Sequence, residues 1–180
     1  MKLWTILTNA VVGWLMIVRG EPGWRDRFTI SAAGLVTALA IFAFLAFLAV
    51  AFASMSIGMP SAGGVVAAMV VLALPIIALV VTLLGTRILL KSDEPMLPVL
   101  VPVLYALSAF LLVEGFLALI SGPVVMLSWL GLFYLLFRLA RVATGWNMGI
   151  AAAFAVLTVV LLVAMRLALY MLSTPAGSPI

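Results

Sequence analysis

The 180-residue sequence contains no cysteine and no histidine, and only 8% of its residues are charged. Without cysteine and histidine, the chain cannot form a disulfide, a zinc site with those ligands or a histidine-ligated haem. Soluble domains carry about 25% charged residues. A chain of this length that is 68% hydrophobic cannot hide so much apolar surface from water. The sequence therefore predicts that lipid surrounds most of the protein.

Long runs without charge predict five membrane-spanning helices, because about 20 helical residues cross the hydrocarbon of a bilayer. The expected spans are Thr29–Ser54, Gly63–Leu90, Val99–Ile120, Pro123–Leu139 and Met148–Leu172. We expect an all-α membrane protein with one five-helix bundle over residues 29–172. An interfacial helix and a cytoplasmic linker are expected over residues 1–28, and a disordered tail over residues 173–180.

Lysine and arginine alternate between the two sides of the predicted membrane. They gather before the first span, after the second and at the end of the fourth, whereas the other two loops and the tail have none. Because positively charged loops stay in the cytoplasm, we expect a cytoplasmic N-terminus and a periplasmic C-terminus in a bacterial inner membrane. The net charge of +4 lies beside the spans and forms no basic stripe, so we expect no nucleic-acid partner.

The first apolar run, residues 3–18, is short for a span. Its apolar residues recur at helical spacing and Asn9 and Gly13 fall near the opposite side, as in an amphipathic helix lying in the interface. We expect Trp4 and Trp14 at headgroup depth. A short or re-entrant span and a cleaved signal peptide are the alternatives, although polar residues interrupt the run and no small-residue cleavage site follows it.

The segment RGEPGWRDRF, residues 19–28, holds five of the fourteen charged residues. Arg19, Arg25 and Arg27 each gain about 1 kcal/mol near anionic headgroups, and Trp24 fits the aromatic belt of an interface. We expect these four residues to form a cytoplasmic surface for lipids or a partner. The simpler interpretation is that they only fix the topology.

Two charged residues fall inside expected spans away from the basic clusters at the span ends, Glu114 in the third and Arg166 in the fifth, each six residues from the outer end. An ion inside the membrane is costly and usually pairs or faces water. We expect an intramembrane polar pair that clamps the bundle or lines a site for a substrate, a proton or a lipid headgroup. Arg166 snorkelling alone is the alternative. Arg138, near the cytoplasmic end of the fourth span, is expected to anchor at the interface.

Sequence motifs for catalysis are absent: we find no metalloprotease, nucleophile-elbow, phosphate-loop or dinucleotide-binding pattern. Histidine and cysteine are missing as base and nucleophile, and no lysine lies within a span to activate a serine. We therefore expect no enzymatic activity, no cofactor and no metal.

Three stretches of the sequence resemble the Yip1-domain family in its short bacterial form with five spans. They are the opening MKLWTILTNAVVGWLMIVRGEPGWRDRF, the third span within LPVLVPVLYALSAFLL, and LSWLGLFYLLFRLARVATGWNMGIAAAF around the last loop. Ser108 stands where the family would have a proline. The resemblance implies a five-span protein with its N-terminus inside and its C-terminus outside, in agreement with the charge pattern. It implies no particular activity.

The sequence leaves three functional hypotheses open. The leading one is a non-enzymatic inner-membrane protein that organises or binds membrane partners, whether lipids, other membrane proteins or a second copy of the chain. A small transporter or channel subunit would be lined by Glu114 and Arg166 and would have a polar cavity reaching one face. An accessory subunit of a larger complex would bury its lateral apolar surface against protein.

Overall fold

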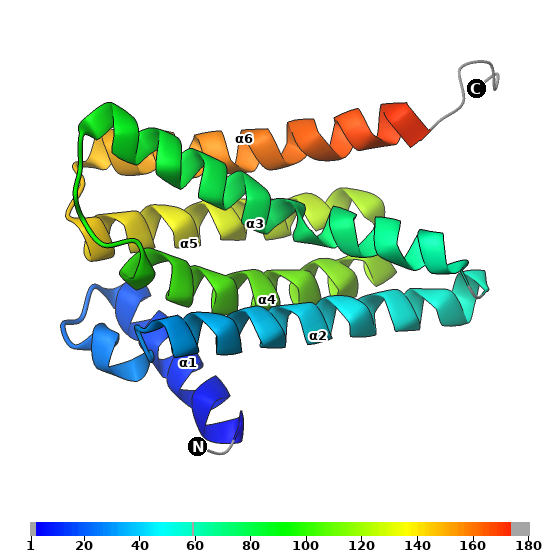
Figure 1. The fold of residues 1–180 in the computed structure, drawn as a ribbon, viewed down its shortest axis with the longest axis horizontal. Helices are drawn as coiled ribbons and strands as arrows, with labels where there is room; N and C mark the ends of the chain where they lie inside the picture. The colour runs from blue at the N-terminus through cyan, green and yellow to red at the C-terminus, as the bar shows by residue number, and fades with distance from the viewer. Residues whose placement is uncertain (1–2, 59, 174–180) are drawn as a thin grey trace.

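The computed structural model describes residues 3–58 and 60–173, and in this part of the chain every regular element is a helix (Figure 1). A short helix α1, Leu3–Arg19, and a 3-10 turn η1, Trp24–Arg27, come first. The long helices are α2 (Ala32–Ile57), α3 (Ala62–Leu90), α4 (Leu97–Ile120), α5 (Met126–Thr144) and α6 (Met148–Ser173), and a second 3-10 turn, η2 (Gly122–Val125), precedes α5.

Five of these helices are long and apolar enough to cross a bilayer. The chain is therefore a polytopic membrane protein, and the predicted fold class is confirmed. Residue 173 ends α6, while the rest of the tail that was expected to be disordered lies outside the described residues.

The helix boundaries follow from local chemistry that the hydrophobic runs alone do not reveal. The second helix begins at Ala32, three residues after the expected start, because the Ser31 hydroxyl accepts a hydrogen bond from the Gly34 amide at 3.1 Å. The fourth span continues past Leu139, because α5 ends only where Gly145 takes a left-handed conformation. Arg138 and Arg141 thus lie within α5.

The two ends of the bundle carry different elements (Figure 1). One end, which we call the α1 end, holds α1, η1 and the connections α3–α4 and α5–α6. The other, the η2 end, holds the α2–α3 connection, η2 and the last turn of α6. Along the bundle α2 packs on α4, α4 on α5 and α5 on α6, while α3 crosses from the end of α2 to pack on α6.

The apolar core is concentrated toward the α1 end. The central helix α4 is buried on several sides from Val99 to Leu111, whereas its last nine residues are not fully buried. The fully buried residues of α3 begin at Leu74. One seam of α2 faces the core at four-residue spacing, and its buried members are Gly34, Ala38, Phe42, Ala46 and Val50. Small residues in such a seam let helices approach closely.

The helix α1 lies against α4 and α5 at the α1 end. It buries Ala10, Gly13 and Ile17, so the prediction that Gly13 lies on the polar side is wrong. A Cβ atom on Gly13 would stand 2.5 Å from Cε2 of Phe28, which shows why only glycine fits where the linker folds back. The exposed side of α1 mixes Thr5 and Thr8 with large apolar side chains, of which Trp4 is 78% exposed.

Candidate functional site: a paired charge inside the spans

Glu114 on α4 and Arg166 on α6 form an ion pair toward the η2 end. Two parallel hydrogen bonds join them, from Arg166 Nη1 to Glu114 Oε1 at 2.5 Å and from Nη2 to Oε2 at 3.0 Å. The glutamate side chain is 14% exposed and the arginine side chain 21%. The structure thus brings together the intramembrane pair expected from the sequence, and Arg166 does not snorkel outward on its own.

Trp129 on α5 completes this cluster, and sequence reasoning missed it. Its indole Nε1 donates to Glu114 Oε1 at 3.2 Å, and the Arg166 guanidinium lies over its ring, 5.7 Å from the centroid. Residues at equal distance from the tight turn that joins α4 to α5 lie at similar depth in this antiparallel pair of helices. Glu114 stands seven residues before Ser121 and Trp129 seven after Gly122, and this symmetry is the signal that would have found the tryptophan.

The charges of the cluster cancel each other. The Glu114 carboxylate accepts three hydrogen bonds, two of them from the cation that neutralises it. Arg166 Nε is buried and has no hydrogen-bond partner within the part of the chain that the structure describes. A cleft between α2 and α3 and a small pocket beside α1 are both lined by residues other than these two. Chemically, the arrangement is a closed polar bridge across three helices.

Of the four residues expected to form a cytoplasmic surface at residues 19–28, the structure leaves the three arginines exposed and buries Trp24. Trp24 is 4% exposed and packs edge-on against Phe28, with ring centroids 6.2 Å apart, so its assignment to the surface is wrong. The prediction failed because an interfacial tryptophan and a core tryptophan look alike in sequence. Arg19 and Arg27 are exposed, and Arg19 lies 3.7 Å from the Glu21 carboxylate.

Arg25 is exposed, but it also makes a contact inside the protein. Its guanidinium lies 5.4 Å from the Trp24 ring centroid, and Nη2 donates to the Ala143 carbonyl oxygen at 3.0 Å, in the last turn of α5. The last carbonyls of a helix have no partners within the helix and carry partial negative charge. Arg25 therefore caps α5 as well as contributing charge to the α1 end.

Arg138 makes the reciprocal contact from α5 to α1. Its Nη2 donates to the Val18 carbonyl oxygen at 2.6 Å and to that of Ile17 at 3.3 Å, both in the last turn of α1. The expectation that Arg138 anchors at the interface therefore omitted its main contact. We call the two capping residues, Arg25 and Arg138, the arginine clamp. It ties the N-terminal segment to the bundle over more than a hundred residues of sequence.

No protein-family model matches the chain, and no curated protein or solved structure shows significant similarity to it. The resemblance to the Yip1-domain family therefore stays a prediction from the sequence.

Proposed function

We propose that this protein is a non-enzymatic component of a bacterial inner membrane that organises or binds lipids or other membrane proteins through its lateral surface. The observation that carries the proposal is the pairing of Glu114 with Arg166. Each neutralises the other, so the spans offer no unpaired acidic group to a transported ion or proton. The outward faces of the long helices instead present large apolar side chains, such as Phe44 and Phe116. An accessory subunit would use the same faces to contact protein.

The hydroxyl groups within the helices support the absence of catalysis. Ser54, Ser108 and Ser128 donate to backbone carbonyls of their own helix or the turn before it, at 2.7, 2.9 and 2.6 Å. A serine nucleophile needs an adjacent base to take its proton, and this sequence supplies no histidine. These serines satisfy their hydrogen bonds locally, as expected of structural residues in lipid.

We infer the orientation from the distribution of charge. Among the described residues, every basic side chain except Arg166 lies at the α1 end or within two helical turns of it. By the positive-inside rule this end is cytoplasmic, as in the bacterial five-span form that the Yip1-domain resemblance implies. Alkaline phosphatase fused after Ile180 should therefore be active, and fused after Ser92 it should be inactive. The reverse pattern would contradict the orientation.

A flux assay separates this proposal from a transporter or channel. The purified protein and the Glu114→Gln variant are reconstituted into liposomes, and proton and ion leakage is compared with that of empty liposomes. We expect no added flux from either protein and a lower unfolding temperature for the variant. A flux that Glu114→Gln abolishes without loss of stability would favour the transporter.

The binding half of the proposal has its own measurement. Native mass spectrometry of the protein, released from nanodiscs, should detect bound lipid, a second copy or another membrane protein. A population that consists only of bare single chains would contradict the proposal.

A further inference from the structure

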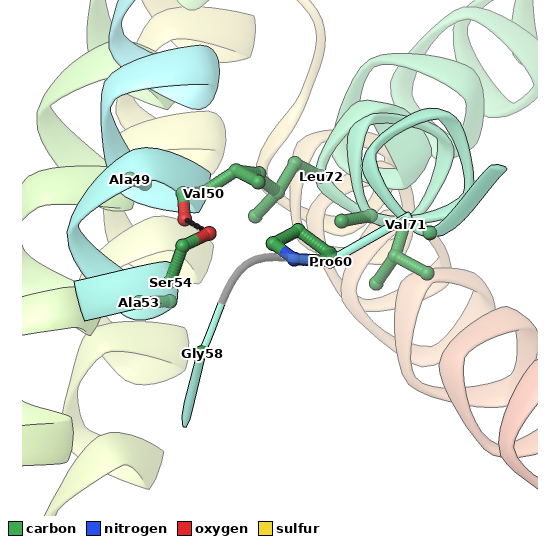
Figure 2. A pocket seen from close by; sticks show the side chains of 10 residues that line it. Ala49, Val50, Ala53, Ser54, Gly58, Pro60, Val71 and Leu72 are labelled. Carbon is green, nitrogen blue, oxygen red and sulfur yellow. Dashed lines mark hydrogen bonds between the residues drawn. The ribbon is translucent and has the colours of Figure 1, made fainter. Parts of the chain in front are cut away.

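A cleft of about 400 Å³ lies between the last turns of α2 and the first turns of α3 (Figure 2). Ala49 and Ala53 form one wall, Ala68 and Leu72 stand on the other, and Pro60 lies at the end where the two helices connect. The lining is almost wholly apolar. The Ser54 hydroxyl is turned back to the Val50 carbonyl oxygen at 2.7 Å and so offers no free donor.

The cleft exists because both helices leave the core at this end. Among the described side chains, the last buried one of α2 is Val50, and the first of α3 is Leu74. Between these positions α3 turns away from α2 on its way to α6 (Figure 1). Among the described residues that line the cleft are Ala49, Ala53, Gly64 and Ala68, whose small side chains leave space between the two helices.

The depth of the cleft falls within one leaflet of a bilayer. Its lining on α3 extends from Gly64 to Leu72, about 12 Å at the rise of an α-helix, and Pro60 lies just before this helix. The hydrocarbon core is about 30 Å thick, so a single leaflet contributes about half of this depth. A partner helix that crosses the membrane would need a groove along the whole span, whereas this cleft ends where α3 joins the core.

The chemistry of the cleft walls decides whether water, a lipid headgroup or a hydrocarbon chain fits the cleft. Water requires polar partners that the lining does not supply, and an empty apolar volume forfeits dispersion contacts with its walls. The residues lining the cleft carry no charge, so they provide no group to select an anionic headgroup. A flexible hydrocarbon chain fits both the apolar walls and the one-leaflet depth.

We propose that this cleft binds a single acyl chain of a phospholipid from the leaflet at the η2 end. The inference rests on the proposed function, which it narrows by naming a lipid tail as ligand and the gap between α2 and α3 as its site. The lipid is held by its tail, and the headgroup lies near the uncharged connection between the two helices.

Adjacent alanines on α3 provide a matched pair of variants for the test. Ala68 lines the cleft, whereas Ala67 is exposed outside it. Ala68→Phe should fill the site and Ala67→Phe should leave it open, although both add the same side chain to the same turn. If one of these variants fails to fold, the comparison can be repeated on α2, the opposite wall. There Ala49→Phe should fill the site, and Ala51→Phe is its control.

The probe is phosphatidylcholine with a diazirine midway along one acyl chain, mixed into phosphatidylcholine vesicles that contain the protein. After illumination, adducts are mapped by mass spectrometry. In the wild type and in Ala67→Phe, we expect adducts to concentrate on the cleft-lining segments of α2 and α3. In Ala68→Phe, labelling of the cleft-lining segments should fall several-fold. Labelling of α5 and the unfolding temperature should stay the same as in the wild type.

A depth series on the wild type needs no variant. Moving the diazirine toward the end of the acyl chain should move the adducts from Ser54 toward Ala49. Labelling that is spread evenly over all lipid-facing helices, or is indifferent to Ala68→Phe and to Ala49→Phe, would overturn the inference. So would photo-crosslinks that join two copies of the chain through this cleft. These results would leave the proposed function standing if bound lipid or protein is still detected elsewhere on the molecule.

Discussion

The α1 end and the η2 end of the bundle are stabilised by different interactions. At the α1 end a continuous apolar core surrounds α4, and the arginine clamp and a hydrogen bond from Trp14 Nε1 to the Pro102 carbonyl oxygen at 2.9 Å fix α1 upon it. Near the η2 end one cluster, Glu114, Arg166 and Trp129, bridges three helices whose outer turns are mostly exposed. The comparison teaches that, in the described part of the chain, many moderate contacts hold the α1 end, whereas the ion-paired cluster is the strongest contact near the η2 end.

The two ends also use arginine differently. At the α1 end most cations face outward, yet Arg25 and Arg138 also cap helices, so residues that fix topology contribute to the fold as well. At the η2 end Arg166 is paired with Glu114, so the pair adds no net charge. Loss of one cap should therefore be tolerated, whereas loss of Arg166 should not.

The largest expected effect is from Arg166→Leu, which leaves the Glu114 carboxylate unpaired at hydrocarbon depth. Breaking one side of a buried ion pair costs about 3 kcal/mol or more, whereas replacing both partners by apolar residues is often nearly neutral. The double variant Glu114→Leu with Arg166→Leu should therefore be more stable than Arg166→Leu alone. Denaturant unfolding in mixed micelles, followed by tryptophan fluorescence, measures the free energy of unfolding. If the single and double variants had the same free energy of unfolding, the ion pair could not be the contact that stabilises the η2 end.

The second expected effect lies at the α1 end. Gly13→Leu forces a side chain into the ring of Phe28, which is itself 6% exposed and has little room to move. Overpacking of this kind costs about 2 kcal/mol. Hydrogen exchange should accelerate in α1 and η1, and the η2 end should keep its protection. Gly131→Leu is the control, because a Cβ at Gly131 meets nothing within 4 Å; an equal loss in both variants would argue against the close approach at Gly13.

The division between the two ends also decides how much the sequence can predict. Span number and the meeting of Glu114 with Arg166 are predictable, because the length of an apolar run and the depth of an ion in it are properties of the sequence alone. The arginine clamp and the burial of Trp24 are not, because they depend on how segments about 120 residues apart dock. Trp129 is intermediate, since the tight turn after α4 fixes its register against Glu114.

The arginine clamp should give a smaller effect than either change above. Arg138→Met removes the hydrogen bonds to the Ile17 and Val18 carbonyl oxygens, at a cost of about 1.5 kcal/mol for bonds from a charged donor. Arg141→Met is a matched control, because Arg141 is exposed on the same helix and its loss changes the net charge equally. Hydrogen exchange in the last turn of α1 should rise only in Arg138→Met. A rise in both variants would show that charge, rather than capping, holds α1 in place.

The smallest effect tests whether polar pairs matter away from the η2 end. The hydroxyls of Thr82 on α3 and Thr158 on α6 are 2.7 Å apart, so one donates to the other, and the accepting hydroxyl donates its own proton to a carbonyl oxygen of its helix. Interhelical hydrogen bonds in membranes average about 0.6 kcal/mol, so Thr158→Val should lower the free energy of unfolding by roughly that much. Thr37→Val, which loses only a bond within its own helix, is the control. If Thr158→Val lowered the free energy of unfolding nearly as much as Arg166→Leu does, the packing of α3 would also depend on one polar contact. The contrast between the two ends would then fail.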